Sequence, residues 1–196
     1  TYRLDRFEQT MTPEGADAVE EVVMHTTSVS LEQIEPQRYF NSGFTAEVEA
    51  AYELNPRGKG EWGVQTEIEH NLLLFGDHRM RYALIAEESR RPLWRTTRLG
   101  GGDTQRTIDR RSFPSERYAT TGVTYEFPLF RPDWGTITLL GFYEGGVAEG
   151  PEFYHGPGAG FRFYISRVTL PAVGFDLAYR ATQRKWLFSF SIGMSM

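Results

Sequence analysis

The most regular feature of this sequence is an alternation of apolar and polar positions that returns in segment after segment. Near the C-terminus, for example, Phe188 and Phe190 alternate with Ser189 and Ser191. Successive side chains of a β-strand point to opposite faces of its sheet, so this pattern predicts strands with one apolar and one polar face. Eight segments share it: 44–54, 61–74, 79–87, 123–129, 136–144, 161–166, 173–180 and 186–196.

The connections between these segments alternate in length. Tight turns are predicted at Gly76–Asp77 and Arg131–Asp133, whereas the longest connection spans residues 89–117. A less regular segment within residues 19–31 is a candidate ninth strand, so residues 1–40 hold either an extra strand or a tail. The pattern predicts an all-β, antiparallel, up-and-down sheet of eight strands, or nine if residues 19–31 form one.

Membrane barrels, soluble sandwiches and soluble ligand-binding barrels all show this alternation. Several segments exceed the roughly 5–6 residues of typical globular strands and approach the roughly 9–11 of a tilted membrane-spanning strand. Aromatic residues such as Trp62 and Trp186 lie near predicted strand ends, as in interfacial girdles. The polar faces carry charges of both signs at mid-strand: Glu47, Glu67, Arg81, Glu126, Glu144, Arg162 and Asp176. These features favour a transmembrane β-barrel region over residues 1–196, with a polar lumen in which the charges pair.

The composition excludes several other classes of protein. No apolar run approaches the roughly 18 residues of a spanning helix, and the 14% of aromatic residues is unlike a disordered chain. The chain has no cysteine, which excludes disulfides and thiol chemistry. A net charge of -5 argues against a nucleic-acid partner.

One stretch of the long predicted loop carries a recognisable motif. Residues 99–108 read Leu-Gly-Gly-Gly-Asp-Thr-Gln-Arg-Thr-Ile, and residues 110–113 read Arg-Arg-Ser-Phe. This stretch resembles the sixth extracellular loop of the BamA/TamA outer-membrane assembly-factor superfamily, which includes the two-partner-secretion transporters. The segments 123–129, 142–146, 158–163, 173–179 and 188–196 resemble that family's following strands, in the same order. The family's Arg-Gly-aromatic is here Arg106-Thr107-Ile108, and its terminal Phe or Trp is here Met196.

The resemblance implies a protein of a bacterial or organelle outer membrane that inserts or translocates other proteins, with no catalytic residues, metal or cofactor. Its partners would be outer-membrane lipid and client outer-membrane proteins. The family's loop arginine folds into the lumen and pairs with acids on the next two strands. By position, Arg106 would pair with Glu126 or Glu144, because both share the lumen-facing parity. The alternative is that Arg106 is a solvent-exposed loop residue among its basic neighbours.

Two other readings of function stay open at this point. The chain could be a free-standing small outer-membrane barrel, even an envelope-lipid-modifying enzyme, or it could be a soluble ligand-binding barrel. A Ser-His-acid hydrolase needs serine and histidine on one face, and the parity of His70 directs it toward lipid. The basic residues Arg90, Arg91, Arg95 and Arg98 could contact lipid phosphates, although such clusters are more often solvated.

Two further expectations concern the walls of the barrel. The closing strand should present Trp186, Phe188, Phe190, Ile192 and Met194 to lipid. The resemblance also implies a barrel of sixteen strands, of which eight predicted strands would supply half. We therefore expect an upstream segment, a second chain or a symmetry mate to complete it, the alternative being a closed eight-stranded barrel with residues 1–40 as a tail.

Overall fold

The computed structural model describes residues 2–11, 22–54, 60–90, 97–99, 106–107, 113–148, 153–165 and 171–192. Its elements follow the chain as strands joined by turns, with one short 3-10 helix, η1. Their bounds are β1 Tyr2–Met11, β2 Val22–Pro36, β3 Asn41–Leu54, β4 Gly60–Leu73, η1 Phe75–Asp77, β5 Arg79–Arg90, β6 Thr97–Leu99, β7 Phe113–Ser115, β8 Arg117–Phe130, β9 Gly135–Ala148, β10 Phe153–Ile165, β11 Pro171–Arg180 and β12 Lys185–Ile192. Among the described residues, no helix has the length and apolar character needed to cross a membrane.

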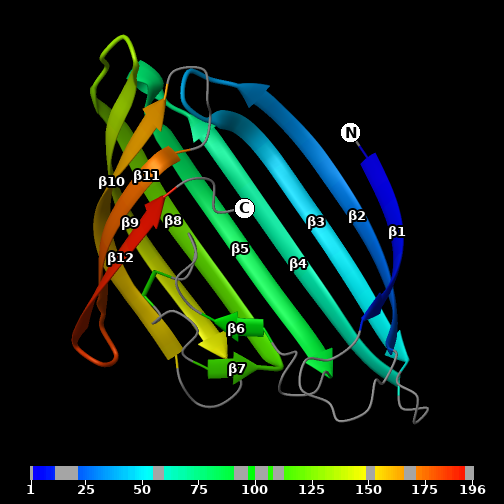
Figure 1. Ribbon diagram of the computed structural model, residues 1–196. Helices are drawn as coiled ribbons and strands as arrows, with labels where there is room; N and C mark the ends of the chain where they lie inside the picture. The colour runs from blue at the N-terminus through cyan, green and yellow to red at the C-terminus, as the bar shows by residue number, and fades with distance from the viewer. Residues whose placement is uncertain are drawn as a thin grey trace.

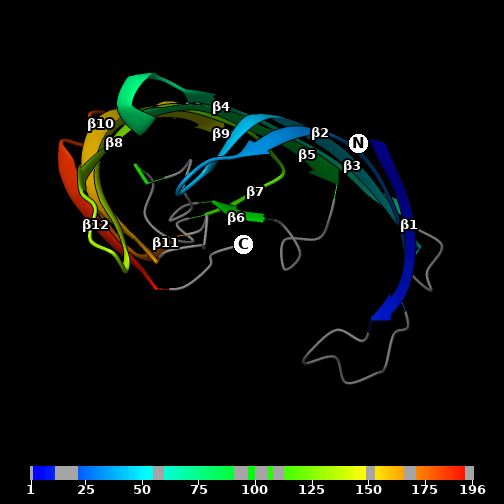
Figure 2. The same ribbon diagram turned by 90° about the horizontal axis from the view of Figure 1, so that it is seen from above.

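Ten strands form one sheet in the order β1-β2-β3-β4-β5-β8-β9-β10-β11-β12, and β6 pairs with β7 in a small second sheet. Every described pairing is antiparallel between neighbours in the order, so the predicted antiparallel up-and-down sheet is confirmed. The sheet curves strongly, with β6 and β7 on its concave side (Figures 1 and 2). No pairing between β1 and β12 occurs among the described residues, and closure into a barrel stays a prediction.

The main sheet has ten described strands, whereas the pattern predicted eight, or nine with residues 19–31. All eight segments are strands, and the candidate ninth at 19–31 is β2, which runs later than expected, to Pro36. The tenth strand, β1, lies within residues 1–40, which were left open as an extra strand or a tail. Inside the predicted loop 89–117, β5 extends to Arg90, and β6 and β7 add a short pair.

The alternation pattern does not predict the parts of strands that contain glycine and proline. Gly145 and Gly146 belong to β9, and Gly156, Pro157 and Gly158 belong to β10. The connection between the predicted segments 136–144 and 161–166 is therefore shorter than expected, because β9 continues to Ala148 and β10 already begins at Phe153. These residues have little or no side chain to alternate, but their backbone groups still complete the pairing of β9 with β10.

The connections differ at the two ends of the sheet. At one end β2 passes to β3 through residues 37–40, β4 to β5 through η1, and β8 to β9 through residues 131–134. In the η1 turn Gly76 has a φ of 63°, a left-handed conformation that glycine adopts without steric cost. The connections at the other end include the long one between β5 and β8 (Figure 1). The predicted tight turns at Gly76–Asp77 and Arg131–Asp133 are confirmed.

The two faces of the sheet differ as the alternation predicts. On β8 to β11 the concave face is buried, and its aromatic and aliphatic side chains pack into small clusters, such as Tyr118 with Tyr154 and Leu140 with Phe142. The convex face carries the apolar set, and most of its large members are exposed. On β3 and β4 the concave face is more open, and Glu47 and Glu67 there are exposed. The charged residues of the C-terminal strands thus lie inside, and the apolar residues lie outside.

Candidate functional site

The candidate site is a polar network on the concave face, into which Arg106 and Thr107 project from the long β5–β8 connection. The Arg106 guanidinium donates to Glu144 of β9, with 2.6 Å between Nε and Oε1. The backbone N–H groups of Arg106 and Thr107 donate to Oε2 of the same carboxylate, at 2.7 and 3.3 Å. The side chain of Glu144 is 1% exposed and that of Arg106 is 4% exposed. One buried carboxylate therefore holds both the side chain and the backbone of the loop.

Three other groups fix the orientation of the Arg106 guanidinium. Its central carbon lies 3.6 Å from the centre of the Phe142 ring, close enough for a cation–π contact. Nη2 donates to Oγ1 of Thr124 at 2.9 Å, and Nη1 lies 3.7 Å from Oδ1 of Asp176. Strands β8, β9 and β11 thus each contribute a side chain to one loop residue.

Asp176 links Arg106 to a second buried arginine. Arg162 of β10 donates to both carboxylate oxygens of Asp176, each at 2.8 Å, in the bidentate geometry that suits a guanidinium and a carboxylate. On β11, Nε of Arg180 donates to the backbone carbonyl of Thr107 at 2.6 Å. Arg106, Arg162, Glu144 and Asp176 carry balanced charges, so the burial of each is offset by an opposite charge.

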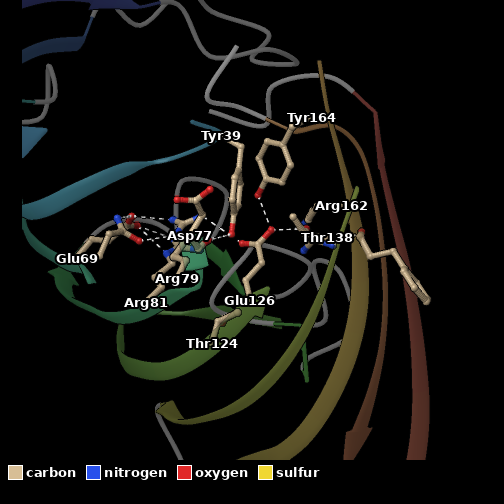
Figure 3. A network of polar contacts seen from close by, with 12 residues as sticks. Tyr39, Glu69, Asp77, Arg79, Arg81, Thr124, Glu126, Thr138, Arg162 and Tyr164 are labelled. Atoms are coloured by element: carbon tan, nitrogen blue, oxygen red, sulfur yellow. Dashed lines mark hydrogen bonds and ion pairs between the residues drawn. The ribbon is translucent and has the colours of Figure 1, made fainter. Parts of the chain in front are cut away.

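Glu126, the other acid predicted to hold Arg106, belongs to a different part of the network (Figure 3). Oε1 accepts hydrogen bonds from the hydroxyls of Thr138 and Tyr164, the second at 2.8 Å. Oε2 lies 3.5 Å from Nη1 of Arg79 on β5. The structure therefore brings Arg106 to Glu144 and not to Glu126.

The register explains this difference. Glu144 lies opposite Gly122 and Glu126 lies opposite Leu140, so the two carboxylates are separated by four positions along the strands. At about 3.3 Å per residue this is roughly 13 Å, too far for one guanidinium to reach both. The shared parity of the two acids correctly predicted the face of the sheet on which they lie. Only the register shows how far apart they are along the strands.

The Glu126 level of the network continues across the sheet toward the short turns. Arg79 and Arg81 of β5 both contact Glu69 of β4, with 2.8 Å between Nε of Arg81 and Oε2. The Tyr39 hydroxyl donates to the carbonyl of Asp77 at 2.7 Å and so joins two turns. Burial is the main cause that raises the pKa of the Tyr39 phenol well above its usual value, so it stays protonated as a donor.

The closing strand predicted to face lipid is β12, at the edge of the sheet. Trp186, Phe188, Phe190 and Ile192 are exposed on the convex side, and Phe188 is 70% exposed. Met194, the last member of that predicted set, lies outside the described residues. Leu187, Ser189 and Ser191 point to the other side and are less exposed. The strand thus keeps its alternation although, among the described residues, it pairs with β11 alone.

The sequence prediction did not name several members of the network. Arg162 and Asp176 were noted as charged strand residues without a partner, and Phe142, Thr124 and Arg180 were not assigned to the site. Their parity was the available signal, because all five lie on the predicted polar face. The chemistry of the network is that of an anchor, since it holds a loop by charge-assisted hydrogen bonds. Within the described part of the chain, no group of three or more side chains is suited to bind a metal ion.

Comparison with known proteins adds no assignment: neither a family model nor a curated protein matches this chain.

Proposed function

We propose that this chain forms the wall of a transmembrane β-barrel in an outer membrane and that the barrel inserts or translocates other proteins. The observation that carries the first part is the contrast between the faces of the sheet. The convex face exposes large apolar side chains on strand after strand, whereas the buried concave face of β8 to β11 holds paired charges. A soluble sheet buries its apolar face, and a membrane barrel exposes it to lipid.

The second part of the proposal rests on the loop and on the resemblance of the sequence to the BamA/TamA assembly factors. A long connection that folds back into the concave side and is anchored there by an arginine suits that family. The anchor at Arg106 uses a carboxylate on β9, which is one of the two strand positions that the resemblance implied. Insertion or translocation of a protein breaks no covalent bond, so the proposed function depends on binding surfaces. The convex face would contact lipid, and client segments would contact the sheet edges or the lumen.

Reconstitution tests both parts of this proposal. The protein, refolded into vesicles of phosphatidylethanolamine and phosphatidylglycerol, should run faster in a gel before heating than after and should resist added protease. The same vesicles should then accelerate the folding of a urea-unfolded small outer-membrane barrel several-fold. Client folding is measured as the appearance of its own heat-modifiable, protease-resistant form.

Two controls make the assay specific. Vesicles with an equal amount of an unrelated porin correct for bilayer defects that assist folding without a dedicated surface. Arg106→Gln removes the charge of the loop anchor and should reduce the acceleration, whereas Arg38→Gln in an exposed turn should leave it unchanged. A rate equal to that of the porin vesicles would refute the assembly function. A protein that never enters the vesicles would refute the membrane assignment.

A further inference from the structure

A groove crosses the convex face of β4, β5, β8 and β9, near the end of the sheet that bears the long connection. It consists of two adjoining hollows of about 660 and 570 Å³. Ala119 and Val147 line both of them, so the hollows meet there. In the register Ala86, Ala119 and Val147 form one row across β5, β8 and β9. Volumes of this size fall in the roughly 300–1,000 Å³ range of small-molecule sites.

The floor of the second hollow is apolar although it contains a threonine. Thr121 lies between Leu84 and Gly145 in the next row of the register. Its hydroxyl donates to the carbonyl of Ala83 at 3.1 Å, so this polar group is already satisfied by the backbone. Gly145 contributes no side chain, and a Cβ added there would meet its neighbours only at ordinary contact distance, 3.5 Å or more. The floor is therefore low and presents hydrocarbon to any occupant.

The walls of this hollow are held in place by one another. Tyr143 and Phe153 both line it. The Tyr143 hydroxyl lies 2.6 Å from Nδ1 of His155, and the Phe153 ring stacks on the same histidine with 5.0 Å between ring centres. This fixed geometry makes the groove a preformed feature of the face.

The first hollow reaches a charged rim at the end of the strands. Arg117 and Glu88 line it and form an ion pair at 2.8 Å, in which both side chains remain exposed. Arg90 is exposed at the end of β5, opposite Trp62 in the register. Glu87 also lines this hollow, but it is buried, opposite Tyr118 in the register. The exposed part of the rim therefore carries two guanidiniums, those of Arg117 and the neighbouring Arg90, and one carboxylate, that of Glu88. An apolar trough that ends at a basic rim matches a molecule with a hydrocarbon chain and an anionic head.

We propose that this groove binds a phosphate-bearing membrane lipid, with an acyl chain over Ala119 and Thr121 and the phosphate at the rim near Arg117 and Arg90. The inference rests on the proposed function, because it requires the convex face to lie in a bilayer. Guanidinium groups suit phosphate oxygens through paired hydrogen bonds. The site gives the outer wall of the barrel a preferred lipid at one fixed place.

Tryptophan quenching by brominated lipids tests this proposal directly, because Trp62 lines the groove. A variant with Trp94, Trp134 and Trp186 changed to Phe retains Trp62 alone, and a second variant retains only Trp186, which is exposed on β12 away from the groove. Both are reconstituted in phosphatidylcholine vesicles that contain brominated phosphatidylglycerol or brominated phosphatidylcholine. We expect phosphatidylglycerol to associate with the Trp62 site about fivefold more strongly, which corresponds to about 1 kcal/mol for one basic side chain near the surface. Trp186 follows the exposed residues Arg184 and Lys185, so it can show a general preference for anionic lipid, but changes in the groove should not alter its quenching.

Matched variants then locate the preference. Ala119→Leu fills the groove where its halves meet and should abolish the fivefold preference at Trp62. Ala159→Leu makes the same change at an exposed convex position of β10 and should leave it intact. Arg117→Gln should reduce the preference while retaining quenching by both lipids.

Three other outcomes would overturn the lipid site, the membrane assignment or both. If Trp62 and Trp186 are both quenched without any preference, the face lies in lipid but the groove selects nothing, and this inference fails alone. If neither is quenched, the face is not in the bilayer, and the proposed function fails with it. If Trp62 is protected, Trp186 is quenched and the particle has twice the mass of one chain, a second copy occupies the groove and the lipid proposal is overturned.

Discussion

At the scale of single residues, the Arg106–Glu144 contact ties the loop to the sheet. Glu144 is 1% exposed and has Arg106 as its cationic partner. Removal of the arginine would leave a buried carboxylate with only backbone donors, and breaking such a pair typically costs about 3–5 kcal/mol. The two backbone N–H groups that bind the same carboxylate mean that the loop depends on Glu144 as much as Glu144 depends on the loop.

We therefore predict that Arg106→Glu lowers the free energy of unfolding by several kcal/mol and that Glu144→Arg in the same chain restores part of it. Glu126→Arg should restore nothing, because Glu126 accepts from Thr138 and Tyr164 at another height of the face. Urea unfolding in vesicles measures all the variants in two double-mutant cycles, one for each acid. Equal coupling of Arg106 to Glu144 and to Glu126, or no coupling to either, would contradict the assignment of Glu144 as its partner.

The sequence predicted this residue contact only in part. Parity placed Glu126 and Glu144 on one face, and the resemblance implied that one of them holds Arg106. The choice between them depends on which residue of β8 lies opposite which residue of β9, and alternation does not contain that information. The same limit applies to Asp176 and Arg162, whose faces were predicted and whose pairing was not.

At the scale of elements, β12 shows how far alternation alone determines the fold of a strand. Phe188 and Phe190 point outward, and Ser189 and Ser191 point inward, as the sequence predicts. The strand β1 shows the opposite case. Its apolar residues Leu4 and Phe7 are three positions apart, so they do not keep one parity and no strand was predicted there. The predicted ends of β9 and β10 were wrong for a related reason, because glycine and proline interrupt the alternation in these strands.

If the convex face of β12 lies in lipid, an arginine should be tolerated on one side of the strand only. We predict that Phe190→Arg costs about 2–4 kcal/mol of folding free energy near the middle of the bilayer. Ser189→Arg is the matched control and should cost less, because position 189 lies on the concave side of the same strand, opposite Asp176, and does not face lipid. Reversible unfolding in vesicles gives both values. Equal costs at the two positions would place neither face in lipid.

At the scale of the whole molecule, the open sheet is the feature that the proposal must accommodate. β1 and β12 lie at its two edges. An open edge presents unpaired N–H and C=O groups, and within the hydrocarbon of a bilayer each unpaired group costs several kcal/mol. Both edges must therefore be covered in a membrane, either by each other or by strands from elsewhere.

We predict that strands from elsewhere cover them: an upstream segment, a second chain or a second copy of this one. The strong curvature lies in β8 to β12, whereas β1 to β4 run away from them in a flatter arc, so the edges stand apart (Figure 2). The chain has no cysteine, and one cysteine placed in β1 and one in β12 therefore report on the edges without interference. If a second chain or a second copy covers the edges, the protein folded in detergent should have a mass above the 22.5 kDa of one chain. In all three cases the two cysteines should not join within a single chain under mild oxidation. Cysteines placed in the paired strands β11 and β12, at positions 178 and 187, are the positive control, since these residues are register partners. A folded particle of one chain in which the β1 and β12 cysteines link as readily as that control would instead establish a closed ten-stranded barrel, with ample strands for closure because eight suffice.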